Sequence, residues 1–119
     1  MLLDSVILID YLNGISDAEA FIDAHPSAVI SVITLAEVLA GVDDAGEDAL
    51  RQYLATFRVL ELDRAIAERA AALRRAERWK LPDAIQAAFA QHHGIRLVTR
   101  NTKDFEPERH AFVLIPYTL

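Results

Sequence analysis

The sequence predicts a single α/β domain over residues 1–119, in which a five-stranded parallel sheet is flanked by helices in three layers, α/β/α. Short buried-type runs alternate with helical segments along the chain, and strands separated by helices pair in parallel. The 119 residues are enough for one domain and too few for two. Hydrophobic residues make up 53% of the chain and Pro and Gly number four each, so we expect a packed core.

Five runs have the length and composition of buried strands, being apolar, β-branched or alternating. They are Met1–Leu3, Ala28–Val32, Arg58–Leu62, Ile95–Thr99 and Ala111–Ile115. Polar or turn-forming residues end three of them: Asp4 follows the first run, Asp63 the third and Pro116 the fifth. The sheet is therefore expected to deliver carboxylates at the ends of its strands.

Six segments have helical patterns. They are Ser5–Asn13, Asp17–His25, Thr34–Ala40, Asp48–Thr56, Ala65–Trp79 and Asp83–His92. Gly41 and Gly94 follow two of them, as is common at helix C-termini. Pro82 suits the first helical position of the last. Residues 43–47 are acidic and small and predict a loop, and residues 102–105 predict a turn or short helix.

Composition excludes several classes of protein. No cysteine is present, which rules out disulfides, thiolate metal sites and a cysteine nucleophile. The N-terminus lacks a basic region, and Asp4 and Asp10 interrupt its apolar run, so a secretory signal is not expected. No apolar stretch approaches the roughly 20 residues that a membrane helix needs. We therefore expect a soluble cytoplasmic protein without a membrane partner.

Charge is distributed unevenly along the chain. The net charge is −6, but residues 1–50 carry ten acids and no Lys or Arg, whereas residues 51–119 carry all twelve Lys and Arg and eight acids. A nucleic-acid partner usually meets a basic surface. One interpretation is a basic patch that faces an acidic, metal-filled site; the other is that charges simply fall on solvated faces.

Several acids are expected to meet at one edge of the sheet. Asp4 ends the first strand, Glu37 lies early in the helix after the second, and Asp83 begins the helix that leads into the fourth. Asn101 and Asp104 follow the fourth strand. In right-handed crossovers, strand C-termini and helix N-termini share an edge, where open α/β sheets bind ligands.

Such a cluster calls for a cation. Two unit charges about 4 Å apart repel by roughly 4 kcal/mol at an effective dielectric of about 20. A helix N-terminus offsets only about 0.3–1 kcal/mol of this. Oxygen ligands without cysteine favour Mg²⁺ or Mn²⁺. A hard cation held by carboxylates with open positions is typical of phosphoryl transfer or phosphodiester hydrolysis.

Each acid also has a purely structural interpretation. Asp4 can cap the first helix, and Glu37 can close a Thr-x-x-Glu capping box. Asp83 can complement a helix dipole. Asn101 can cap the following turn with Asp104 as its reciprocal partner. Their expected coincidence on one edge favours a site.

Four stretches resemble, in order, the motifs of the PIN domain, and specifically of VapC-type ribonuclease toxins from bacterial toxin–antitoxin pairs. They are Leu2–Ser5, Ser31–Gly41, Leu81–Ala88 and Leu97–Phe105. The resemblance implies cleavage of RNA (tRNA, rRNA or mRNA) that depends on Mg²⁺ or Mn²⁺. It further implies a homodimer and inhibition by a cognate VapB-type antitoxin.

By position in these motifs, Asp4, Glu37 and Asp83 are the acidic core. The fourth acid is either Asp104 or, as a neutral oxygen ligand, Asn101, because many members have Asp at that position. Asp4 and Asp83 are expected to hold the principal Mg²⁺, while Glu37 and Asp104 orient its waters or complete a second site.

Secondary contacts follow from the same motifs. Ser5, Thr99 and Asn101 are expected as polar contacts of the site. Arg100 and Lys103 are expected to hold the RNA backbone.

Two other functions fit parts of the pattern. One is a PIN-fold binding module with weak or no catalysis, which would bind no divalent ion. The other is a phosphoacceptor receiver domain with Asp63 as acceptor. The receiver pattern is incomplete, since the first strand delivers a single acid and no Lys follows the fifth.

Overall fold

The structure, a computed structural model, describes all residues 1–119 and has six helices and five short strands. The strands are β1 (Leu2–Leu3), β2 (Ile30–Ser31), β3 (Val59–Leu60), β4 (Leu97–Val98) and β5 (Val113–Leu114). The helices are α1 (Ser5–Leu12), α2 (Ser16–Ala24), α3 (Val32–Ala40), α4 (Glu47–Leu54), α5 (Arg64–Glu77) and α6 (Leu81–His93). The predicted alternation of strands and helices is confirmed.

All strand pairs are parallel. β4 lies between β1 and β5, and β2 pairs with β3. A parallel bridge between Leu2 and Val29 joins the two groups, with Leu3 N donating to Val29 O at 2.9 Å. The order across the sheet is therefore β3-β2-β1-β4-β5. From β1 the chain adds β2 and β3 on one side, and it then crosses back to place β4 and β5 on the other side of β1. The direction of strand addition therefore reverses between β1 and β4, which is where an open α/β sheet binds ligands.

Alternate strand residues feed two separate cores, which establishes the three layers. Leu2, Leu97 and Val113 are paired across the sheet and pack with α5 and α6 in one cluster. Leu3 and Val98, one residue further along, pack with α1, α3 and α4 in the other. This is the period of two expected for a strand buried on both faces.

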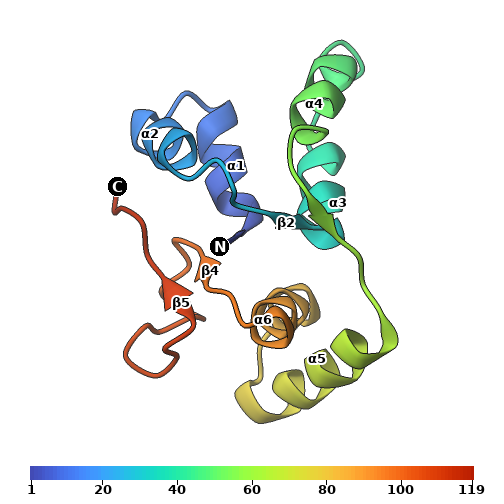
Figure 1. Cartoon of the computed structure of the whole chain (residues 1–119), viewed down its shortest axis with the longest axis vertical. Coiled ribbons are helices and arrows are strands. Elements are labelled where there is room, and N and C mark those ends of the chain that lie inside the picture. Colours follow the sequence, from blue (N-terminus) through green and yellow to red (C-terminus); the bar gives the residue numbers. More distant parts are fainter.

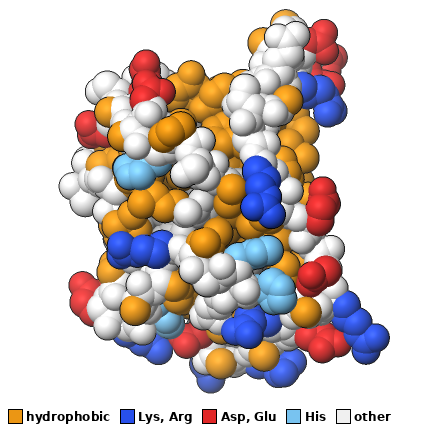
Figure 2. All heavy atoms as spheres, in the orientation of Figure 1, with side chains coloured by type: hydrophobic (Ala, Val, Ile, Leu, Met, Phe, Trp, Pro, Cys, Tyr) orange, Lys and Arg blue, Asp and Glu red, His pale blue; other side chains and the backbone are white.

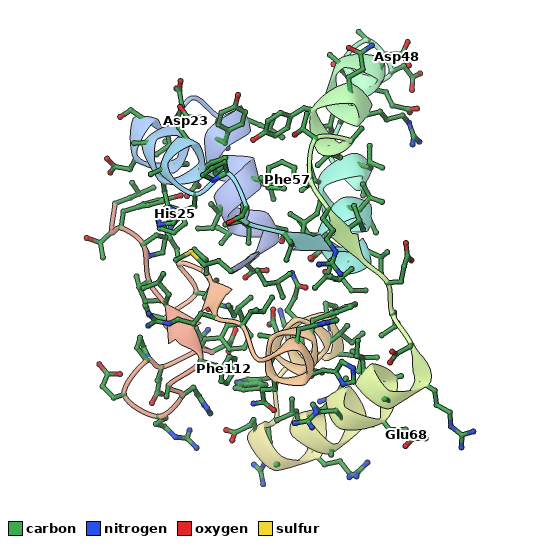
Figure 3. The ribbon with its side chains drawn as sticks, in the orientation of Figure 1. Asp23, His25, Asp48, Phe57, Glu68 and Phe112 are labelled. Carbon is green, nitrogen blue, oxygen red and sulfur yellow. The ribbon has the colours of Figure 1, made fainter.

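The helices follow this division (Figure 1). α5 and α6 pack side by side on one face, while α1 contacts both α2 and α3, and α3 also contacts α4. In Figure 3, Phe57 points into the space between α1 and α3, where it packs against the second cluster. None of the helices combines the length and apolar character required to cross a lipid bilayer.

Helix boundaries differ from the predicted ones where a cap decides them. α3 begins at Val32, two residues early, because Ser31 accepts from the backbone of Ile33 and Thr34 at 3.2 Å. Thr34 is therefore not the cap, and the predicted capping box with Glu37 is wrong.

The two helices before β4 also have shifted ends. α5 ends at Glu77 because Arg78 adopts a left-handed conformation with φ 60°. Trp79 is therefore outside the helix. α6 begins at Leu81, so Asp83 is its third residue rather than its first.

Candidate active site

Asp4 is the centre of the candidate site. It follows β1 and is buried, with 6% of its surface exposed. Its Oδ1 accepts hydrogen bonds from Ser5 N at 2.9 Å and Gln86 Nε2 at 3.1 Å, and its Oδ2 accepts from Thr99 Oγ1 at 2.7 Å. Asp4 thus caps α1, as one interpretation predicted, while side chains from two other elements fix both of its oxygens.

Gln86 connects the buried polar groups of the site, and no motif in the sequence singles it out. It is 1% exposed and lies on α6 among buried alanines. Besides the bond to Asp4, its Nε2 donates to Thr34 Oγ1 at 2.7 Å, and its Oε1 accepts from Ser31 Oγ at 2.5 Å. Thr34 in turn donates to Leu3 O at 3.3 Å. Both N–H groups and the carbonyl oxygen of this buried amide take part in hydrogen bonds, as a stable buried polar network requires.

The turn after β4 carries Asp104 into the same region. Asn101 Nδ2 donates to Asp104 Oδ2 at 3.0 Å, and Asp104 N donates to Asn101 Oδ1 at 3.2 Å. The predicted reciprocal cap is therefore present. Thr99 Oγ1 accepts from Asn101 N at 3.1 Å, which ties this turn to Asp4. Trp79, between α5 and α6, donates its Nε1–H to Asp104 O at 2.8 Å.

Glu37 lies in the second turn of α3. Ser5 Oγ donates to its Oε1 at 3.1 Å, which connects the start of α1 to α3. Partial desolvation of the carboxyl group raises the pKa of Glu37; the Ser5 hydrogen bond opposes this, and the negative charge of Asp4 adds to it. Glu37 and Asp4 are thus electrostatic neighbours.

The negative charges of all three other predicted acids affect the pKa of Asp83. Burial, together with the negative charges of Asp4, Asp104 and Glu37, raises the pKa of Asp83 to about 6, while Lys80 opposes the rise. A carboxyl group acquires a raised pKa where it is desolvated and where like charges lie near it. The acids that are far apart in sequence are therefore close enough to influence one another.

The donor set fits a hard divalent cation. It consists of carboxylates without Cys, and histidine does not join it. No three of these side chains stand close enough to form a ready-made metal cluster. Mg²⁺ is commonly bound by one or two carboxylates and retains several waters, so it does not require a cluster of three protein ligands. Asp4 and Asp83 are the residues that would hold it.

The two predicted RNA-contacting cations have different surroundings. Arg100 makes a bidentate ion pair with Asp10, with Nε at 2.6 Å and Nη2 at 2.8 Å. Tyr117 OH donates to the same carboxylate at 2.9 Å. Asp10 is 5% exposed, so this cluster ties α1, the turn after β4 and the C-terminal segment together. Lys103, in contrast, is exposed and makes no ion pair.

An apolar groove adjoins the acidic region. It has a volume of about 560 Å³ and is lined by residues of α1, α3, α4 and the α3–α4 connection: Ile9, Tyr11, Leu12, Asn13, Glu37, Val38, Gly41, Val42, Gly46, Ala49, Leu50 and Tyr53. Ile9 and Leu12 are 41% and 47% exposed, unusual for large apolar side chains. Glu37 is common to the groove and the site.

Comparisons with known proteins agree with this geometry. Residues 1–107 match the PIN domain family. The chain is similar to a chain of a toxin–antitoxin complex from Klebsiella pneumoniae, with 42% identity and a TM-score of 0.92 over 99% of this chain and 98% of that one. No match was found among curated protein sequences.

Two more distant structures share the fold. FitAcB from Neisseria gonorrhoeae is 25% identical, with a TM-score of 0.80 over 99% of each chain. VapBC2 from Rickettsia felis, bound to a DNA fragment of its promoter, is 19% identical, with a TM-score of 0.73 over 95% of this chain and 94% of that one. The family match and the 42% identity lead to one conclusion: the chain belongs to the PIN domain family.

Proposed function

We propose that this protein is a metal-dependent ribonuclease, a hydrolase of RNA phosphodiester bonds. The observation that carries the proposal is the mutual electrostatic influence of Asp4, Glu37, Asp83 and Asp104 beside the switch point of a parallel sheet. Four carboxylates at this position repel one another without a cation, and with a bound cation they can support phosphodiester hydrolysis. Nucleases are common among PIN domains, which supports the same reaction class.

Asp4 and Asp83 would hold Mg²⁺ or Mn²⁺. A cation bound there lowers the pKa of coordinated water and offsets the charge that develops on the attacked phosphate. Thr99 and Gln86 fix the two oxygens of Asp4, so this ligand is oriented before the cation arrives. Loss of such a supporting hydrogen bond typically costs about 10–100-fold in metal affinity or activity.

Glu37 and Asp104 are assigned to a supporting role. Ser5 orients Glu37, and Asn101 orients Asp104. Both acids would position water or complete a second cation site. Because Nδ2 and Oδ1 of Asn101 both bind Asp104, we favour Asp104 over Asn101 as the fourth acid. Lys103, exposed beside Asp104, would contact the RNA backbone.

We further propose that the protein is the toxin of a toxin–antitoxin pair and works in the cytoplasm as a homodimer. The 42% identity to a chain of a toxin–antitoxin complex supports the pairing. The apolar groove would receive the antitoxin. The hydroxyl of Tyr53 in its wall is buried without a hydrogen-bond partner, and burial raises the pKa of Tyr53 to about 12, so it is available as a neutral donor or acceptor. Basic antitoxin side chains would complement the acids at the end of the groove.

RNA cleavage tests the function. Purified protein is incubated with structured and single-stranded RNAs in Mg²⁺, Mn²⁺ or chelator, beside Asp4→Asn and the exposed control Asp48→Asn. We expect cleavage that requires the metal, persists in Asp48→Asn and falls at least 100-fold in Asp4→Asn, about the loss expected for a metal-site residue. Cleavage by Asp4→Asn at the rate of the unaltered protein would exclude the proposed site.

A further inference from the structure

The last residues of α5 and the turn that leads into α6 form the most basic segment of the chain. Four of its seven residues, from 74 to 80, are Arg or Lys, and we call this segment the α5–α6 turn. Its one acid, Glu77, is engaged by Arg109 at 3.3 Å and His110 at 3.7 Å. Arg78 and Lys80 are exposed, and neither takes part in an ion pair. The structure therefore leaves their charges available.

This segment is fixed against the candidate site. Between its two free cations lies Trp79, which is 5% exposed and donates its indole N–H to Asp104 O at 2.8 Å. Its ring packs on Phe105 with centroids 4.9 Å apart. Arg74 Nη1 also donates to Trp79 O at 3.0 Å. Arg78 and Lys80 thus flank, in sequence, a buried anchor that binds the turn carrying Asp104.

The backbone at Arg78 adds an independent observation. Arg78 is the one residue other than glycine with positive φ, at 60°. The next helix, α6, ends in the same left-handed conformation at φ 64° and uses Gly94 there. Glycine is the residue that suits this position. An arginine held in this energetically unfavourable backbone conformation points to a functional role for its side chain.

We propose that the α5–α6 turn binds backbone phosphates of the RNA strand beside the scissile bond, with Arg78 and Lys80 as the principal contacts. This proposal rests on the proposed ribonuclease function and adds the surface along which the RNA strand lies. Residues 1–50 carry no Lys or Arg, so the opposite side of the site, formed by α1 and α3, repels phosphates. Figure 2 shows no Lys or Arg over the α1–α2 corner, while such side chains gather around the end formed by α5 and α6.

Binding is measured without cleavage, by fluorescence anisotropy of a labelled single-stranded RNA in chelator over a range of salt. Each lost phosphate contact on a single strand lowers the slope of log K against log salt by about 0.7. Arg78→Gly with Lys80→Ala is expected to lower the slope by about 1.4 and weaken binding roughly 25-fold at 0.1 M salt. The control Arg58→Ala removes an exposed, unpaired arginine elsewhere and is expected to leave the slope nearly unchanged.

Stability separates binding from folding. Arg78→Gly places the favoured residue in the left-handed position, so its melting temperature is expected to equal or exceed that of the unaltered protein while RNA affinity falls. Lys80→Ala alone gives a second, less perturbing test of the same surface.

The outcomes distinguish the two proposals. The proposed phosphate contacts would be excluded if the double variant and Lys80→Ala both bound RNA as tightly as the unaltered protein, or if Arg58→Ala lost as much affinity as they do. Metal-dependent cleavage by the unaltered protein would still support the ribonuclease function. Failure of the unaltered protein to bind or cleave any RNA would overturn the ribonuclease itself, and the phosphate contacts with it.

Discussion

The side-chain amide of Gln86 donates to Asp4 Oδ1 at 3.1 Å and so joins residues 82 positions apart in sequence. The contact connects the middle of α6 to the end of β1. Gln86 binds Oδ1 of Asp4, while Thr99 binds Oδ2. The position of the central carboxylate is thus determined by three elements of the fold.

Gln86→Met tests this network. The change preserves side-chain size but removes one buried hydrogen bond each from Asp4, Ser31 and Thr34, and a buried polar group that loses its partner costs about 1–3 kcal/mol. We expect the free energy of unfolding in urea to fall by about 2–4 kcal/mol. The control Gln52→Met, at an exposed site on α4, is expected to stay within about 0.5 kcal/mol of the unaltered protein. A small effect at Gln86 would show that the network is not satisfied as described.

Asp83→Asn tests the crowding of the acids. The pKa of Asp83 is raised from 3.8 to about 6, so the folded protein holds this proton more tightly than the unfolded chain does. The free energy of unfolding therefore falls as pH rises from 3.8 to about 6, and the penalty is fully present above that range.

In metal-free buffer at pH 7, Asp83→Asn is thus expected to stabilise the protein by on the order of 1–2 kcal/mol, with the gain vanishing near pH 4. Thermal melts at both pH values measure it, with Asp48→Asn as the exposed control. A variant less stable than the unaltered protein at pH 7 would refute the crowding.

The Asp10–Arg100 pair predicts the opposite pH dependence. The hydrogen bond from Arg100 holds the pKa of Asp10 below its usual 3.8, against the effect of burial. The stabilisation is present above pH 3.8 and is lost as pH falls through the lowered value.

Asp10→Asn is expected to cost about 2 kcal/mol at pH 7, as for hydrogen bonds to charged groups, and progressively less in acid. Urea titrations at several pH values follow the difference. An equal cost at pH 7 and at the lowest accessible pH would mean that the charge of Asp10 is not what matters.

Asn101→Asp examines the fourth acid. The new carboxylate replaces the amide that donates to Asp104 Oδ2 at 3.0 Å, so two like charges would face each other. Without metal, we expect a loss of about 1–2 kcal/mol. Added Mg²⁺ is expected to raise the melting temperature of the variant more than that of the unaltered protein. Asn13→Asp provides an exposed control, and equal Mg²⁺ responses of all three proteins would contradict the assignment.

The sequence was sufficient for the fold because each strand is a buried run on both faces, and alternate residues such as Leu2 and Leu3 supply opposite cores. The approximate edge position of the acids followed from parallel topology alone. Helix starts were less certain, since Ser31 and Thr34 are both good caps and only the backbone geometry selects Ser31.

Residues that act through distant partners could not be identified in this way. Gln86 is one amide on an alanine-rich helix, and its partners come from three other elements. The position of Arg100 after a strand of the site predicts an RNA contact, whereas its bidentate partner Asp10, 90 residues away, has no signal in the sequence. The left-handed conformation of Arg78 has no sequence signal, since glycine is the usual marker.

The central claim is that Asp4 and Asp83 hold a divalent cation. Calorimetric titration with Mn²⁺ tests it most directly, using the unaltered protein, Asp4→Asn, Asp83→Asn and Asp48→Asn. The account predicts that the unaltered protein and Asp48→Asn bind the ion alike, and that Asp4→Asn and Asp83→Asn each bind it at least 10-fold more weakly. No ion bound by the unaltered protein, or equal binding by all four, would contradict it.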